Sequence, residues 1–193
     1  MSKHLAVRLL SIVLALFIYC NDASAEEYLA PRQEVLTGLG FSHIKEKGDY
    51  NIVPVFLDFN FDLKKTFQDM GVSTPGIFDF VLEPEIAYAY TPDSNAEIAG
   101  NFLLKLGFAP QSWRWQPYCK AGLGVIFLTQ HVYGQSTQFN FNEYGGLGSH
   151  YFLNPETALT VECRFRHASN AGIKSPNTGI NTVFALVGCS LRF

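Results

Sequence analysis

Long apolar runs are missing from most of this chain. After residue 25, no stretch approaches the roughly 18 consecutive apolar residues that indicate a membrane-spanning helix. Apolar residues at the spacing of an amphipathic helix are also scarce. These two absences argue against a helical membrane protein and against a helical bundle.

Cysteine is sparse and has no paired spacing. Beyond the first segment, Cys119, Cys163 and Cys189 remain, an odd number spread over three parts of the chain. A disulfide framework and a cysteine-based metal site are therefore unsupported, and we interpret the three as small apolar residues on a buried or lipid-facing surface. Because no His-x-His pattern or carboxylate cluster occurs either, we expect no catalytic metal ion and no cofactor.

The first 25 residues have the pattern of a secretory signal peptide. Two basic residues precede or enter an apolar stretch from residue 9 to 19, and a run of small residues ends at Ala25. A membrane anchor is the alternative, but the apolar stretch is well short of the roughly 20 residues that a spanning helix needs. We therefore expect a signal peptide over 1–25 and a single domain over 26–193.

Positive charge is also lacking. Removal of residues 1–25 takes away two of the 14 basic and one of the 17 acidic side chains, which leaves 12 against 16 and a net charge of −4. Nothing basic enough to bind nucleic acid remains. What the chain has instead is apolar and aromatic residues, at 48% and 15% of the total, so it is too hydrophobic to be disordered.

Strict alternation of side-chain character replaces helical spacing. At the end of the chain, one face of a predicted strand is uniformly apolar and the other is mixed; the apolar face holds Val183, Ala185, Val187, Cys189, Leu191 and Phe193. Comparable segments separated by turn-rich breaks predict eight strands. They lie at 33–45, 50–63, 77–91, 95–108, 113–129, 137–153, 157–169 and 180–193.

An exported all-β chain of this size is either a soluble sandwich or lipocalin-like barrel, or a membrane-spanning barrel. In 157–169, apolar residues alternate with Glu162, Arg164 and Arg166, which one strand alone does not assign to the inside or outside. Three features favour the membrane: strands of about ten residues or more, aromatic residues sufficient for girdles, and the final Phe193. We predict an all-β, eight-stranded antiparallel transmembrane up-and-down β-barrel whose interior is filled by side chains. The three charges then lie in the lumen, where we expect acidic and amide partners.

A dense motif occupies residues 167–181, which read His-Ala-Ser-Asn-Ala-Gly-Ile-Lys-Ser-Pro-Asn-Thr-Gly-Ile-Asn. A His, a Ser two residues later, Asn-Ala-Gly, and then Pro-Asn-x-Gly-Ile resemble the hallmark of the lipid A 3-O-deacylase (PagL) family. The resemblance is dense over 137–193 and elsewhere rests on architecture. It implies an esterase of the Gram-negative outer membrane that removes an ester-linked hydroxyacyl chain from lipid A, with lipopolysaccharide as substrate and membrane lipid as surroundings.

Strand geometry gives this motif a place in the membrane. His167 and Ser169 continue the odd-numbered face of 157–169, and Asn181 continues the odd-numbered face of the last strand, so all three are predicted to face lipid. Polar groups are unfavourable there, and a membrane-embedded substrate supplies a reason for them. With both termini in the periplasm, 157–169 runs outward and ends in the outer leaflet.

The residue types suggest roles in acyl transfer. We expect Ser169 to be the nucleophile and His167 the general base that later protonates the leaving alcohol. The resemblance implies an oxyanion hole from the backbone N–H of Gly172 and the side-chain amide of Asn177. On the substrate side of the loop, Asn170 is expected to position the turn, and Lys174 is either a contact to a lipid A phosphate or a solvated lysine.

The motif departs from the family at its last position, where well-known members carry Glu and this chain has Asn181. An amide oxygen still accepts a bond from the histidine Nδ1–H, but it lacks the charge that stabilises imidazolium. We hypothesise that Glu143 substitutes for that charge, provided that a three-residue turn sets the strand register so that Glu143 lies beside His167.

Two other functions fit the same pattern. One is a non-catalytic small barrel of the OmpA/OmpX type, and the other is an acyl-transfer barrel enzyme. The remaining histidines at strand ends, His43, His131 and His150, are interpreted as girdle or loop residues. A homodimer stays open as a partner assignment.

Overall fold

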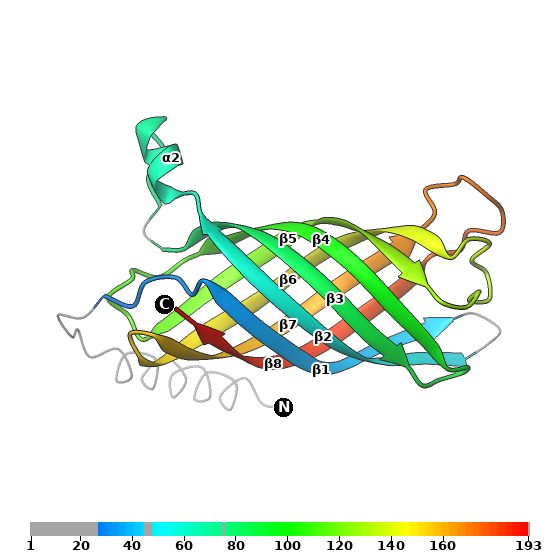
Figure 1. Cartoon of the computed structure of the whole chain (residues 1–193). Helices are drawn as coiled ribbons and strands as arrows, with labels where there is room; N and C mark the ends of the chain where they lie inside the picture. The colour runs from blue at the N-terminus through cyan, green and yellow to red at the C-terminus, as the bar shows by residue number, and fades with distance from the viewer. Residues whose placement is uncertain (1–26, 45–47, 75, 193) are drawn as a thin grey trace, which may run out of the picture.

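The computed structural model describes residues 27–44, 48–74 and 76–192, and within them the strands close into a single barrel (Figure 1). Each strand pairs antiparallel with its neighbours in the sequence, and β1 pairs with β8 to complete the ring. The strands are β1 (Gln33–Ile44), β2 (Gly48–Asp62), β3 (Phe78–Ala89), β4 (Asn95–Gly107), β5 (Trp115–Leu128), β6 (Phe139–Asn154), β7 (Thr157–Ser169) and β8 (Ile180–Leu191).

The predicted fold is confirmed, and the predicted strand ends agree with the observed ones to within two residues. The expected signal peptide over 1–25 and the final Phe193 lie outside the described residues. A short helix, α2 (Lys64–Asp69), connects β2 to β3. Among the residues described, no helix is long and apolar enough to cross a membrane.

The alternation seen in the sequence separates the two surfaces of the barrel. Large apolar side chains such as Val161, Phe165 and Val187 are exposed on the outer face, where a soluble protein would carry its polar residues. Cys163 and Cys189 are free thiols exposed on the same face, as predicted. Most charged residues in the middle of the strands, such as Glu83, Arg164 and Arg166, point inward instead and are almost completely buried.

The lumen is filled by paired charges. Arg164 donates two hydrogen bonds to the carboxylate of Glu83, at 2.7 and 2.8 Å, and a third to Glu162 at 2.5 Å. Arg166 bonds Glu97 at 2.7 Å and Glu85 at 3.1 Å. The predicted acidic partners are therefore present, and this pairing offsets the cost of burying so many charges.

The two ends of the barrel differ. β1 begins beside the end of β8, as the pairing of Gln33 with Leu191 shows, and α2 lies at this same end. The connection between β7 and β8 extends from the opposite end (Figure 1). The motif of residues 167–181 therefore lies at the mouth remote from the chain ends, as the strand count predicts.

Candidate active site

His167 and Asn181 face each other across β7 and β8 on the outer surface of the barrel. They are directly paired in the strand register, and His167 Nδ1 lies 2.6 Å from Asn181 Oδ1. Because an amide oxygen only accepts, this contact places the imidazole proton on Nδ1. Nε2 is then the unprotonated, basic nitrogen. A histidine that acts as a general base needs this tautomer.

Ser169 is the last residue of β7 and lies two positions beyond His167 on the same half-buried face. Side chains at i and i+2 of a strand are neighbours. No hydrogen bond joins Ser169 to His167 in the described part of the structure, and such bonds commonly tighten only when substrate binds. The structure therefore brings the two groups to one face without a direct bond.

Glu143 lies directly opposite His167 on the other side, in β6. This pairing depends on a register shift between Phe152 and Asn154, next to the β6–β7 turn. The expected pairing is thus observed, although the turn has two residues between the paired Asn154 and Thr157 and not the expected three, and the register shift makes up the difference. The exposed Glu143 and Asn181 flank the imidazole from two strands. The hydrogen bond to Nδ1, however, comes from Asn181.

Asn170 organises the loop that follows. Its side chain is completely buried; Oδ1 accepts the Gly172 N–H at 3.0 Å, and Nδ2 donates to the carbonyl of Lys174 at 2.8 Å. Asn177 Oδ1 accepts the Asn170 N–H at 3.0 Å, which turns the Asn177 amide nitrogen to the opposite side. These contacts fit a role for Asn170 in holding the turn, whereas Lys174 is exposed.

A second loop, between β5 and β6, braces this one. Ser136 donates through its backbone N–H to the Pro176 carbonyl at 3.0 Å and through Oγ to the Lys174 carbonyl at 2.8 Å. The Thr178 N–H donates to the Gly134 carbonyl at 2.9 Å. The sequence offered no sign of this bracing, since the two loops are about 40 residues apart.

Gly179 is a further residue whose role the sequence did not reveal, although it is part of the motif. Its backbone is left-handed, with φ of 73°, and a Cβ atom placed there would come within 2.6 Å of His167 Cε1. Only glycine combines this conformation with this close approach. The loop therefore lies directly against one edge of the imidazole.

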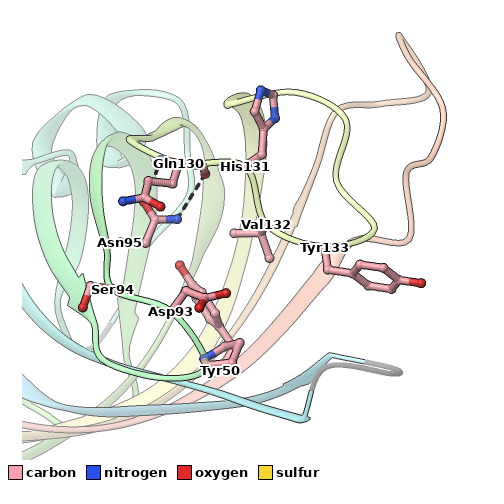
Figure 2. A pocket seen from close by; sticks show the side chains of 9 residues that line it. Tyr50, Asp93, Ser94, Asn95, Gln130, His131, Val132 and Tyr133 are labelled. Atoms are coloured by element: carbon pink, nitrogen blue, oxygen red, sulfur yellow. Dashed lines mark hydrogen bonds between the residues drawn. The ribbon is translucent and has the colours of Figure 1, made fainter.

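A separate cavity of about 260 Å³ lies at the same mouth but away from these residues. Figure 2 shows its lining, drawn from the β3–β4 turn and the β5–β6 loop, with Asn95 Nδ2 bonded to the Gln130 carbonyl at 3.2 Å. None of the predicted site residues lines it. Nor do the described residues contain a cluster of three or more His, Cys, Asp or Glu that could hold a metal ion.

Comparison with known proteins identifies the family. The model of the lipid A 3-O-deacylase (PagL) family matches residues 55–190. This chain belongs to that family. Its members are lipid A deacylases, and membership places the barrel in the Gram-negative outer membrane.

Individual relatives agree with this assignment. The chain is 33% identical over 69 residues to the lipid A deacylase PagL of Bordetella bronchiseptica, an alignment that spans 34% of this chain and 36% of that protein. The crystal structure of the outer membrane enzyme PagL superposes with a TM-score of 0.63 at 18% identity, over 80% of this chain and 97% of the other. The crystal structure of Neisserial surface protein A superposes with a TM-score of 0.56 at 13% identity, over 83% of this chain and 97% of the other. At these identities the two structures share the fold alone.

Proposed function

We propose that this barrel is an esterase that removes an ester-linked hydroxyacyl chain from O-3 of lipid A. The observation that carries the proposal is the 2.6 Å contact between His167 Nδ1 and Asn181 Oδ1 on the lipid-facing surface, with Ser169 on the same face. On a surface that faces hydrocarbon, an imidazole fixed in this tautomer beside a hydroxyl does not stabilise the fold. It suits a substrate that lies in the membrane.

In the proposed reaction, Ser169 Oγ attacks the ester carbonyl while its proton passes to His167 Nε2. The tetrahedral intermediate collapses when His167 returns that proton to the departing sugar hydroxyl. Water, deprotonated by the same imidazole, then hydrolyses the acyl-Ser169 ester and releases the hydroxy fatty acid. Asn181 holds the ring throughout by accepting the Nδ1–H.

The oxyanion would be held by the side-chain amide of Asn177 and the N–H of Gly172. Because Asn177 Oδ1 is bonded to the Asn170 N–H, its NH₂ group is left to donate. The Gly172 N–H now bonds Asn170 Oδ1, so it must exchange or share that bond when the oxyanion forms. Each such donor typically contributes about 3 kcal/mol to the transition state.

The outer face of the barrel also has an apolar groove that could hold the acyl chain. An apolar hollow of about 590 Å³ lies on the outer face of β6, β7 and β8, nearer the middle of the barrel than His167. Between the two, a Cβ atom at Gly145 would meet nothing within 4 Å. The groove is lined by Leu147, Gly148, Ser149, Val161, Glu162, Cys163, Ala185, Leu186 and Val187.

The alternative is a barrel with the deacylase fold but little or no activity. The neutral Asn181 favours it, since the corresponding Asp to Asn change in a serine protease costs about 10⁴ in turnover. An acyl-transfer enzyme is the third possibility. Mass spectrometry of lipid A from a Gram-negative host that expresses the chain separates the three, through loss of one hydroxyacyl chain, no change, or a gain of one acyl chain.

The nucleophile is tested in the same assay. Ser169→Ala should leave lipid A fully acylated while the barrel still folds, because the removed hydroxyl holds no part of the sheet. Ser94→Ala, a change of the same type in the exposed β3–β4 turn, serves as the matched control and should deacylate like the parent. Deacylation by Ser169→Ala at the parent rate would refute the assignment.

A further inference from the structure

The catalytic imidazole belongs to a longer row of polar side chains. Strand pairing fixes Glu143 beside His167, His167 beside Asn181, and His43 beside Asp49. The β1–β8 register pairs Ser42 with Thr182, so the next position sets His43 beside Asn181. The row therefore crosses five adjacent strands on the outer face: Glu143, His167, Asn181, His43 and Asp49.

This row marks a boundary in depth. One step further along the strands towards the middle of the barrel, β7, β8 and β1 present Phe165, Val183 and Phe41, which are paired side by side and all exposed. On β7, β8 and β1 the surface below the row is thus apolar, and above the row these strands soon end in loops. On β2 the residue paired with Phe41 is the polar Asn51. An ester bond at the level of His167 has its acyl chain on the apolar side and its alcohol portion at or above the row.

A groove of about 560 Å³ opens beside Asn181, across β8, β1 and β2. It contains the pair His43 Nδ1 and Asp49 Oδ1, 3.0 Å apart, whose side chains are each 72% exposed. An exposed polar contact of this kind contributes little to stability. The other residues of the groove are Phe41, Ser42, Asn51 and Asn181.

We infer that this groove binds the sugar of the substrate, the hexosamine from whose O-3 the acyl chain is cut. The inference rests on the proposed function and adds to it the side from which the sugar approaches. Asp49 and Asn51 offer planar oxygen and amide groups to the sugar hydroxyls, and Phe41 offers an aromatic face to the apolar side of the ring. Asn181 belongs to both the groove and the catalytic pair, so a sugar held here has its ester beside His167.

The other flank of His167 is less suited to a sugar. There, Phe139 and Phe141 of β6 lie edge to face with ring centroids 5.6 Å apart, and Phe141 is paired with Ser169. These exposed rings provide no hydrogen-bonding groups, so Glu143 is the polar member of the row on this flank, whereas the groove across β8, β1 and β2 has several polar side chains. The polar groove on β8, β1 and β2 is therefore the sugar side, and the apolar hollow on β6 to β8 is the acyl side.

The test compares two esters with the purified barrel in detergent micelles. Lipid A carries the sugar, whereas p-nitrophenyl decanoate presents an acyl ester without one. Asp49→Asn keeps the shape of the side chain and removes its charge, and Phe41→Ala removes the aromatic face. Each should raise the KM for lipid A by about tenfold, the effect of losing one good contact, and so lower the preference for lipid A over the nitrophenyl ester by the same factor.

Phe102→Ala is the matched control for Phe41→Ala, since it removes an exposed ring from the outer face of β4, a strand that does not line the groove, and it should leave the preference unchanged. An equal loss on both esters in Asp49→Asn would mean that the pair acts on His167 through Asn181, which overturns the inference. Unchanged kinetics on both esters would show that the contact between His43 and Asp49 is an ordinary solvated one, and this result would also overturn the inferred sugar site. A parent that cleaves the nitrophenyl ester but not lipid A would instead refute the proposed function.

Discussion

Asn181 Oδ1 accepts a hydrogen bond from His167 Nδ1 at 2.6 Å and thereby sets the tautomer of the imidazole without supplying a charge. The ring is oriented as in a catalytic triad, but the imidazolium that the proposed mechanism would form lacks a counter-ion at this position. Two experiments follow from this relationship.

Asn181→Asp should raise the kcat for deacylation, by about tenfold or more, since loss of the carboxylate in a serine protease lowers turnover by about 10⁴. The substitution keeps the geometry and adds the missing charge. It is measured by quantifying free hydroxy fatty acid over time, with Asn181→Leu as the counterpart that removes the acceptor and should lower kcat below that of the parent. An Asp variant no faster than the parent would show that the charge is already provided.

Glu143 is the residue proposed to provide part of this charge in the parent. Glu143→Gln should lower the kcat of the parent, because the carboxylate opposite His167 is lost. In the Asn181→Asp background the same change should matter much less, so the double-mutant cycle should be non-additive. Equal effects of Glu143→Gln in both backgrounds would show that Glu143 does not stabilise the imidazolium.

Gly179→Ala should inactivate the enzyme by displacing the imidazole. The added Cβ would lie 2.6 Å from His167 Cε1, and φ at this position is 73°. Gly71→Ala is matched for backbone strain, since φ is 83° there, but its Cβ would meet nothing within 4 Å. Both variants should lose about 1 kcal/mol of stability, but only Gly179→Ala should have a lower kcat. Equal kcat values in the two variants would show that Gly179 has no role in catalysis.

Ala185→Phe should block the proposed acyl groove. A phenyl ring placed between Cys163 and Val187 fills space that an acyl chain would use, so cleavage of long-chain nitrophenyl esters should fall more than that of acetyl or butyryl esters. Ile98→Phe places the same ring on the outer face of β4, remote from the groove, and should leave the chain-length profile unchanged. A parallel loss on all esters would argue against a groove for the acyl chain.

The lumen pairs predict a stability effect separate from activity. Arg164→Met leaves the carboxylates of Glu83 and Glu162 without their principal donor, and breaking a buried pair in this way costs about 3–5 kcal/mol. Urea unfolding should show this loss. The double variant with Glu83→Gln should recover part of it, because the uncompensated charge is then removed; no recovery would mean that the pairing itself contributes little.

Much of this architecture could be predicted from the sequence because alternation is a local signal. The alternation in β7, with Glu162, Arg164 and Arg166 on one face, indicates its conformation. The features that favour a membrane barrel then assign that charged face to the lumen. The same counting placed His167 and Ser169 outside. Counting through the turn at Asn154 also led to the hypothesis that Glu143 lies beside His167, and the pairing is observed, but through a register shift that the sequence did not predict.

What the sequence did not reveal depends on contacts between distant segments. His43, interpreted as a girdle residue, comes beside Asn181 only because β1 closes the barrel against β8. The bracing of the catalytic loop by Ser136 joins segments that no local pattern relates. Gly179 was visible within the motif, but its contact with His167 depends on the path of a loop that spacing alone does not determine.

The paired charges that fill the barrel interior also determine how the reaction is supplied and cleared. Since that interior is packed with side chains, the water that hydrolyses the proposed acyl-enzyme would have to come from the external medium, through the headgroup layer. The fatty acid that the proposed reaction releases would leave sideways into the bilayer. Turnover should therefore vary with the fluidity of the surrounding lipid, as expected of an enzyme whose substrate and product both diffuse in two dimensions.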